Sequence, residues 1–297
     1  MVAGKIAVVG CGMMGRGIAE VMAAAGLSVV AIKATPGSLT EPRDKIRQSL
    51  DRRVKRGKMT AEQCEQVLGR IEFSADLGKV AEADLVIESA VEEEAAKLDL
   101  LKKLEAKMGA QAVLGTNTSS LRLQTLAGAL SRPARFVGLH FFSPVPAMEL
   151  VELGVTDQTS EDAIQRSEAL CTQIGKTAVR IKASPGYIVN RLLVPYLLHG
   201  IETLESGMAS AEGIDTAMRL GCGHPMGPLS LSDMIGLDIV YAMAATMQRE
   251  LDDPRYRIPR TLEQLFKAKQ LGRKSGIGLF DYSGETPKLN PAIKLGR

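Results

Sequence analysis

The chain has 297 residues, of which 45% are hydrophobic, so it can form a sizeable core in one large domain or two ordinary ones. Its formal net charge of +3 is too small to indicate a nucleic-acid-binding protein. No apolar run approaches the roughly 20 residues that span a bilayer, and the N-terminus lacks the layout of a signal peptide. We therefore expect a soluble, cytoplasmic protein with no nucleic-acid or membrane partner.

The first predicted elements are a strand, a tight turn and a helix. KIAVVG (5–10) is a short β-branched run, and MMGRGIAEVMAAAG then favours a helix up to Gly26. SVVAIK (28–33) predicts the second strand. Later apolar runs alternate with helix-like segments at 94–108 and 121–130, which predicts a mostly parallel sheet covered by helices. These later strands are expected at 85–90, 112–117, 135–142 and 177–182.

Strand signals nearly disappear after residue 182, and helical periodicity follows. We therefore place a domain boundary near Ser184, between an α/β domain (1–183) and an all-helical domain (184–297). The first helix of the second domain contains Pro195, where we expect a kink.

The four cysteines, at positions 11, 64, 171 and 222, are scattered. They show no Cys-x-x-Cys pair and no Cys/His ligand spacing, so we predict neither a disulfide framework nor a metal site. Charge, in contrast, is concentrated. Between Arg43 and Lys58 there are eight basic and two acidic residues, a local net of +6 that leaves −3 for the rest. A solvated helix face is the ordinary explanation of such a run, and a patch for an anionic ligand is the alternative.

Gly10, Gly12 and Gly15 spell GxGxxG between the first strand and the first helix. Glycines there permit the turn and let the backbone approach a pyrophosphate, which lies at the positive end of the helix. The motif predicts a dinucleotide-binding domain of the Rossmann type, with Met13 and Met14 in the same turn beside the cofactor.

Lys33 ends the second predicted strand, where domains that prefer NAD usually carry an acidic residue for the adenosine ribose. An ammonium cannot accept hydrogen bonds from the ribose, but it can pair with the 2′-phosphate of NADP. We predict that NADP is accepted; the alternative is that Lys33 points into solvent and the ribose is held otherwise.

His140 ends a predicted sheet strand, at the edge where open α/β sheets bind ligands. A dehydrogenase needs a base for the hydroxyl proton, and an imidazole with an ordinary pKa of about 6.5 suits that task. Glu152 lies twelve residues further on, in the next apolar run, MELVEL. It can return on a neighbouring strand and hold the second ring nitrogen.

Seven segments, distributed over almost the whole chain, match a known family in order: VVGCGMMGRGIA, IESAVEEEAAKLDLLKKL, TNTSSL, GLHFFSPVPAMELVEL, SPGYIVNRLLVPYL, IDTAMRLGCGHPMGPLSLSDMIGLD and GRKSGIGLFDY. Through these segments the chain resembles the 3-hydroxyacyl-CoA dehydrogenase family, especially its short-chain 3-hydroxybutyryl-CoA type. The resemblance implies a dinucleotide-binding domain, a helical domain that dimerises, an active site in the cleft between them, and reversible oxidation of an (S)-3-hydroxyacyl-CoA in fatty acid metabolism.

The resemblance also implies site residues. His140 matches the catalytic base and Glu152 its partner, while Ser119 and Asn190 match the two residues that hold the substrate oxygen. Neutral donors around a carbonyl that becomes an alkoxide stabilise the developing charge. Without the resemblance, Ser119 alone reads as a helix cap and Asn190 as a buried polar residue.

Further matches concern the cofactor and the CoA group. Four residues match positions near the nicotinamide end of the cofactor: Glu92, Lys97, Asn117 and Ser143. Taken alone, Glu92 and Lys97 read as surface charges at the start of a helix. The basic segment matches a helical arm (38–69) that covers CoA, so four cations are expected near its phosphates: Arg52, Lys55, Arg56 and Lys58.

Three residues depart from the family pattern. Lys33 replaces the acidic residue and puts NAD specificity in doubt, Thr116 stands where Ser is more frequent, and Ser143 replaces an Asn that contacts cofactor. Both hydroxyls keep hydrogen-bonding capacity. The two other histidines, His199 and His224, are assigned structural roles.

Three other functions compete with this interpretation. A related enzyme acting on an acyl carrier protein fits the basic segment as well as CoA does. A non-catalytic cofactor-binding protein, like the lens crystallins that resemble this family, conflicts with the intact catalytic set. A hydroxy-acid dehydrogenase with a lysine base conflicts with HFFSP and TNTSS.

Overall fold

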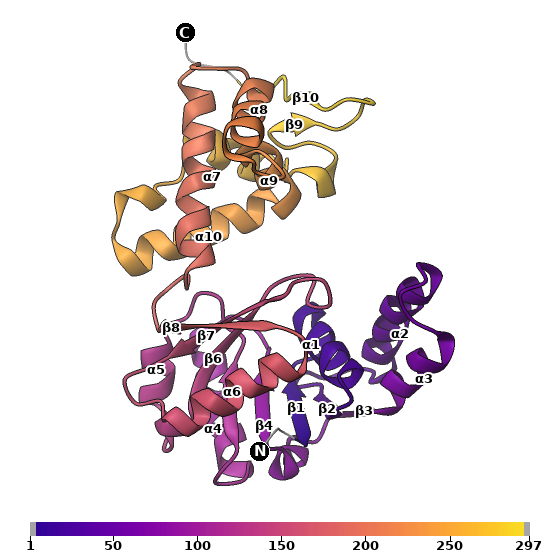
Figure 1. Cartoon of the computed structure of the whole chain (residues 1–297). Coiled ribbons are helices and arrows are strands. Elements are labelled where there is room, and N and C mark those ends of the chain that lie inside the picture. Colours follow the sequence, from indigo (N-terminus) through magenta and orange to yellow (C-terminus); the bar gives the residue numbers. More distant parts are fainter. Residues whose placement is uncertain (1–3, 294–297) are drawn as a thin grey trace. The chain divides into compact units, whose positions relative to one another are not determined.

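The computed structural model describes residues 4–293 and divides the chain between Tyr187 and Ile188 into two compact units (Figure 1). The first unit is built on one eight-stranded sheet with the order β3-β2-β1-β4-β5-β6-β7-β8. All neighbouring strands are parallel except β6 and β7. The strands are β1 (Lys5–Val9), β2 (Ser28–Ile32), β3 (Ile71–Ser74), β4 (Leu85–Glu88), β5 (Val113–Thr116), β6 (Phe136–Phe141), β7 (Leu150–Val155) and β8 (Thr177–Lys182).

The central strands are apolar at nearly every position because helices cover both faces of the sheet. Ile6 and Val8 of β1 belong to one buried cluster and the alternate residues Ala7 and Val9 to another. Helices α1 and α6 contribute to the first cluster, and α4 and α5 to the second (Figure 1). These helices are α1 (Met13–Ala24), α4 (Glu94–Lys107), α5 (Leu123–Gly128) and α6 (Glu161–Gln173), with short 3₁₀ turns η1 (Leu77–Glu82) and η2 (Pro133–Arg135).

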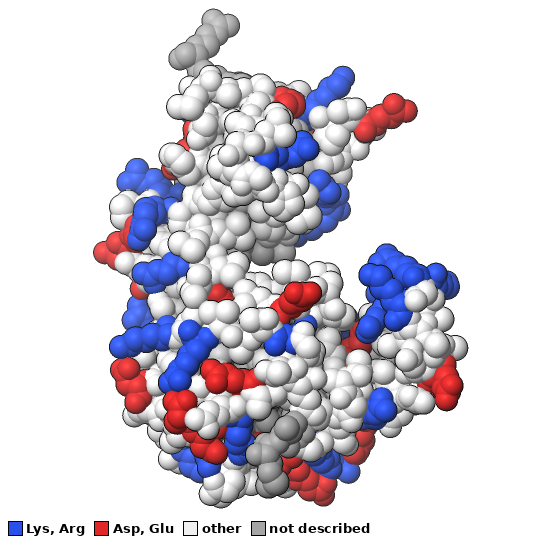
Figure 2. Space-filling view, viewed as in Figure 1, with Lys and Arg blue, Asp and Glu red and all other residues white. Residues whose placement is uncertain are grey.

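Two helices between β2 and β3 form the predicted arm: α2 (Thr40–Lys55) and α3 (Ala61–Gly69). α3 begins at a capping box in which Thr60 and Gln63 satisfy each other's backbone amides. α2 buries only a narrow apolar stripe, including Ile46 and Leu50, and leaves its basic side chains outside. Figure 2 shows Lys and Arg side chains gathered where α2 passes into α3.

The second unit is helical, as the sequence predicts. Its core includes Leu197, Ile201, Val240 and Tyr256. Helix α7 continues through Pro195 from Val189 to Glu205. The helices are α7 (Val189–Glu205), α8 (Ala211–Cys222), α9 (Pro228–Ile235), α10 (Leu237–Leu251) and α11 (Arg260–Lys267), with η3 (Pro254–Tyr256) and η4 (Arg273–Ser275).

The expectation of an all-helical second domain is wrong in one detail. Two short antiparallel strands, β9 (Phe280–Asp281) and β10 (Lys288–Leu289), form a ribbon near the end of the described chain. Asp233 of α9 anchors it, because its buried carboxylate accepts hydrogen bonds from the Leu279 and Phe280 amides at 2.8 Å. Among residues 4–293, no single helix is long and apolar enough to cross a membrane. Helices α9 and α10 have the required length and apolarity only when taken together, and this pair is bent by 97°.

Candidate active site

The glycine-rich turn has the geometry that a pyrophosphate requires. Gly10 has φ +109°, and a Cβ there would lie 2.2 Å from the Ser89 carbonyl oxygen. A Cβ on Gly15 would lie 1.8 Å from the Gly10 oxygen. A Cβ on Gly12, in contrast, would meet no atom within 4 Å, so the space in front of the α1 N-terminus is open. The turn therefore fits a dinucleotide in the way the motif predicts.

A groove of about 520 Å³ continues from this turn along the carboxyl ends of the parallel strands. Its lining includes Gly10 and Gly12 from the turn, Thr35 after β2 and Ser89 after β4. Open α/β sheets bind nucleotides at this edge, where the strand order reverses beside β1. The groove therefore lies where folds of this type bind nucleotides.

Lys33 follows β2 directly and is half-buried. Its Nζ donates a hydrogen bond to the Ser38 carbonyl oxygen at 3.1 Å, at an exposed position just after β2. Of the two methionines in the turn, Met13 is 68% exposed and Met14 is half-buried. Burial raises the pKa of the neighbouring Cys11 thiol to about 11, which makes this thiol unreactive.

His140 and Glu152 meet across the only antiparallel pair of the sheet. β6 and β7 place them in register, and His140 Nδ1 lies 2.7 Å from Glu152 Oε2. Both side chains are buried, with relative exposures of 5% and 1%. Because a carboxylate can only accept, Nδ1–H donates the hydrogen bond to Glu152, and this tautomer leaves Nε2 as an acceptor.

The aromatic ring of Tyr187 covers the sheet next to this pair. Gly138 and Gly154, which are also register partners on β6 and β7, leave a hollow in which the ring lies. A Cβ on Gly138 would lie 2.5 Å from the Tyr187 hydroxyl. The centroids of the Tyr187 and His140 rings are 4.8 Å apart, so Tyr187 shields one side of the imidazole from water.

Ser119 lies in the loop after β5, and Glu92 holds this loop. Glu92 Oε1 accepts hydrogen bonds from the Ser119 and Ser120 amides at 2.9 and 3.1 Å and from Thr118 Oγ1 at 2.5 Å. Burial raises the pKa of Glu92, but the Lys97 ammonium and these hydrogen bonds outweigh it and keep the pKa below its usual value. Glu92 is therefore a charged anchor for the loop.

Lys97 is not the surface charge that a helix start suggests, because its side chain is only 1% exposed. Its Nζ donates to both carboxylate oxygens of the buried Glu88, at 2.7 and 2.9 Å. Asn117 lies nearby at the end of β5 and accepts a hydrogen bond from the Phe141 amide at 2.9 Å, next to His140. The loops after β4, β5 and β6 are thus linked by polar side chains.

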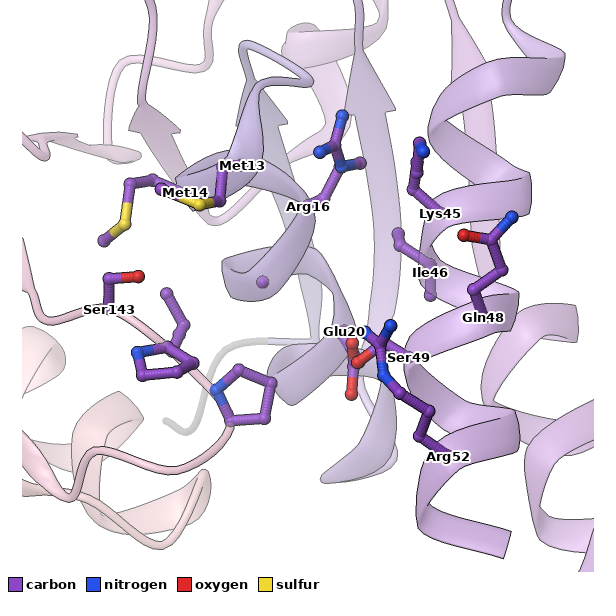
Figure 3. Close-up of a pocket in the computed structure, with 14 residues that line it drawn as sticks. Met13, Met14, Arg16, Glu20, Lys45, Ile46, Gln48, Ser49, Arg52 and Ser143 are labelled. Atoms are coloured by element: carbon purple, nitrogen blue, oxygen red, sulfur yellow. The ribbon is translucent and has the colours of Figure 1, made fainter. Parts of the chain in front are cut away.

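A second cavity of about 350 Å³ lies between α1, α2 and the loop after β6 (Figure 3). Met13, Met14 and Arg16 line it from α1, and Arg52 lines it from α2. Ser143 contributes from the loop. The other three predicted CoA-binding cations do not line this cavity; they are exposed at the end of the arm: Lys55, Arg56 and Lys58.

Glu20 lines the same cavity and is only 2% exposed (Figure 3). Its Oε1 has no hydrogen-bond partner among the described residues, and the nearest cation, Arg53, is 3.7 Å away. Burial raises the pKa of Glu20, although Ser49 and the arginines of α2 partly oppose the increase. The Glu20 carboxylate thus lies against α2, where Ser49, Arg52 and Arg53 offset only part of the effect of burial.

The remaining predicted residues belong to the second unit. Asn190 lies in the first turn of α7. His199 is exposed on the same helix, near Glu202. His224 Nδ1 lies 2.9 Å from the Tyr196 hydroxyl.

Sequence reasoning missed Glu88, Tyr187 and Glu20. Glu88 had one visible signal, a carboxylate in the otherwise apolar run LVIE. A buried charge in a strand requires a partner or a function. Tyr187 and Glu20 gave no comparable signal, because their surroundings come from distant segments.

Comparison with known proteins gives a consistent result. Residues 5–184 match the family described as "3-hydroxyacyl-CoA dehydrogenase, NAD binding domain", and residues 186–282 match "3-hydroxyacyl-CoA dehydrogenase, C-terminal domain". A 3-hydroxybutyryl-CoA dehydrogenase of Mycobacterium tuberculosis is 43% identical over 280 residues, covering 94% of this chain and 98% of the relative. The mitochondrial hydroxyacyl-coenzyme A dehydrogenase of Rattus norvegicus is 39% identical over 284 residues, covering 93% and 90%. The crystal structure of (S)-3-hydroxybutyryl-CoA dehydrogenase from Ralstonia eutropha superposes with a TM-score of 0.90 at 40% identity, covering 95% of this chain and 100% of that one.

Proposed function

The chain belongs to the 3-hydroxyacyl-CoA dehydrogenase family, and we propose that it interconverts a short-chain (S)-3-hydroxyacyl-CoA and the 3-oxoacyl-CoA with a nicotinamide cofactor. The observation that carries this proposal is the buried pair of His140 and Glu152, 2.7 Å apart at the carboxyl edge of the sheet. Relatives of nearly full length are 3-hydroxybutyryl-CoA dehydrogenases, which supports the short acyl chain.

In the oxidation direction, His140 accepts the proton of the C3 hydroxyl at Nε2. Because Nδ1 donates to Glu152, the ring is fixed in the tautomer that has Nε2 free, and the imidazolium that forms is stabilised by the carboxylate. A bound nicotinamide cofactor would supply the acceptor for the hydride that leaves C3. His140 holds the hydroxyl proton at Nε2, and a carbonyl remains at C3.

Ser119 and Asn190 are proposed to donate hydrogen bonds to the substrate oxygen. In the reverse direction this oxygen gains negative charge, so two fixed neutral donors lower the barrier. Glu92 supports the role of Ser119, because it holds the serine backbone by an amide hydrogen bond of 2.9 Å. Asn190 is carried over from the family pattern at the start of α7.

The cofactor is proposed to include NADP as well as NAD. The family match is to an NAD-binding domain. Lys33 adds an ammonium at the position where the 2′-substituent of the adenosine ribose is recognised. Near the nicotinamide end, we propose that Glu92, Asn117 and Ser143 approach the cofactor, with Lys97 behind Glu92.

The carrier of the acyl group is proposed to be CoA, with its phosphates near the basic arm and its chain along the cavity that Arg52 lines. An acidic acyl carrier protein is the alternative that the same charges favour (Figure 2). Saturation by free acetoacetyl-CoA at micromolar concentration supports CoA, and failure to saturate supports the carrier protein.

We also propose a cytoplasmic homodimer. The second unit exposes Met208 and Leu220, which are 80% and 77% accessible, and Met208 lines an apolar cavity of about 240 Å³. Light scattering at several protein concentrations measures the oligomeric state, and a monomer at every concentration contradicts the proposal.

The first test of the function is the initial rate of acetoacetyl-CoA reduction, followed by the loss of reduced-nicotinamide absorbance with NADH and NADPH at equal concentrations. Turnover with either cofactor supports the enzyme. The absence of turnover with both contradicts it.

A further inference from the structure

Glu88 is a fully buried carboxylate at the end of β4. It is the register partner of Thr116 on β5, so both side chains project from the same face of the sheet. The Thr116 hydroxyl donates to Glu88 Oε2 at 2.6 Å, and the Ala90 amide donates to Oε1 at 2.6 Å. The carboxylate is thus fixed from both sides.

Lys97 reaches this carboxylate from α4. Its Nζ contacts both oxygens of Glu88 and also lies 3.4 Å from Glu92 Oε2. One ammonium therefore connects a buried carboxylate with a second one that is 36% exposed. The other carboxylate oxygen of Glu92, Oε1, accepts hydrogen bonds from amides and hydroxyls of the loop that carries Ser119.

We propose that Glu88, Thr116 and Lys97 are positioning residues: they fix Glu92, and through Glu92 they hold the loop that presents Ser119 to the substrate. The inference rests on the proposed function for the role of Ser119, but the order of the loop is a property of the protein alone. None of the three residues is required to touch the substrate.

An ammonium with 1% exposure is stable only next to a charged partner, so the position of Lys97 depends on Glu88. The Glu88 carboxylate in turn depends on its donors, of which Thr116 supplies the only side-chain hydroxyl among the described residues. Without that hydroxyl, the Glu88 carboxylate can rotate. Lys97 then follows this carboxylate and moves away from Glu92.

Thr116 offers a mild and matched test. Thr116→Val keeps the shape of the side chain and removes the donor, whereas Thr116→Ser keeps the donor and removes a methyl group. Thr156→Val is the control at the opposite edge of the sheet, where a buried Thr hydroxyl lies 3.0 Å from Thr159 Oγ1. The full chain is used for all four proteins, including the wild type.

Two measurements are made on each protein. Hydrogen exchange by mass spectrometry follows the amides of residues 117–121, and steady-state kinetics with acetoacetyl-CoA and reduced cofactor gives kcat and both KM values. We expect Thr116→Val to speed exchange about tenfold and to lower kcat about tenfold, with both KM values within about twofold. Thr116→Ser and Thr156→Val should match the wild type.

Unchanged exchange in Thr116→Val overturns the inference, and so does an equal loss in Thr116→Ser. Faster exchange with an unchanged kcat overturns the link to Ser119. If the wild type itself does not turn over acetoacetyl-CoA, the proposed function fails, while the exchange comparison still decides whether Thr116 and its partners hold the loop.

Discussion

His140 and Glu152 are register partners on the antiparallel strands β6 and β7, and this pairing brings His140 Nδ1 to 2.7 Å from Glu152 Oε2. Side chains opposite each other in an antiparallel pair lie on the same face of the sheet. The orientation of the imidazole is therefore set by strand register rather than by a flexible loop.

Replacement of the base tests its role directly. We expect His140→Gln to lower kcat by about 10²-fold to 10⁴-fold, because Gln cannot accept the hydroxyl proton although it can still donate to Glu152. Titration of reduced-cofactor fluorescence should give an unchanged Kd. A variant that keeps most of its turnover contradicts the assignment.

Cofactor preference should depend on Lys33. We expect Lys33→Asp to lower the ratio of kcat/KM for NADPH over NADH by about tenfold or more, because an ammonium is exchanged for a carboxylate that repels the 2′-phosphate. The measurement is kcat/KM with each cofactor at a fixed concentration of acetoacetyl-CoA. Equal ratios in the wild type and the variant leave Lys33 without a role in selection.

Arg52 should contribute to acyl-CoA binding through the cavity between α1 and α2. We expect Arg52→Ala to raise KM for acetoacetyl-CoA about threefold to tenfold with little effect on kcat, and the effect should shrink as salt is added. Arg47→Ala is the matched control on the same helix, because Arg47 is paired with Glu65 at 2.5 Å and does not line the cavity. If the two substitutions have equal effects, Arg52 contributes only to the overall positive charge of the helix and makes no specific contact with acyl-CoA.

The buried carboxylate of Glu20 should lower stability at neutral pH. Burial raises its pKa in the folded protein, so the charged form is disfavoured on folding; the cost is present above the folded pKa and disappears as the pH falls through it. We expect Glu20→Gln to increase the free energy of unfolding by on the order of 1 kcal/mol at about pH 7, and the gain to narrow toward about pH 5.

Chemical denaturation of both proteins across this range checks the prediction. Glu62→Gln, on the exposed face of α3, is the control and should show no gain that depends on pH. A gain for Glu20→Gln that grows as the pH falls has the wrong sign and contradicts the argument.

The hydroxyl of Tyr187 is buried and has no hydrogen-bond partner among the described residues. We expect Tyr187→Phe to preserve kcat, because the ring still shields His140, and to raise the free energy of unfolding by about 1 kcal/mol. Thermal denaturation and the acetoacetyl-CoA assay measure the two effects. A large fall in kcat instead assigns the hydroxyl a part in the reaction.

Much of the fold could be predicted from the sequence because its signals are local. The strand, the turn and the first helix can each be predicted from their own residues: the run KIAVVG, the three glycines and the helix formers after them. β1 and α1 begin where these residue types change. The partnership of His140 and Glu152 was also predictable, since two neighbouring apolar runs joined by a short connection bring residues twelve positions apart face to face.

The surroundings of the charged residues could not be predicted in the same way. Lys97 reads as a surface charge at the start of a helix, and only the arrival of Glu88 from β4 makes its burial possible. Likewise, no residue near Glu20 in the sequence indicates that α2 covers its side chain. The small strands β9 and β10 depend on Asp233, more than forty residues earlier, and have no periodicity of their own.

The short sequence separation between His140 and Glu152 also affects how the protein folds. Of all strand pairings in the eight-stranded sheet, the one between β6 and β7 closes the shortest loop and has the smallest entropy cost of closure. The parallel neighbours need crossover connections, which order more chain before any contact forms. The base and its partner thus belong to a hairpin that can nucleate early, and the nucleotide-binding half of the sheet is the part that depends on long-range folding.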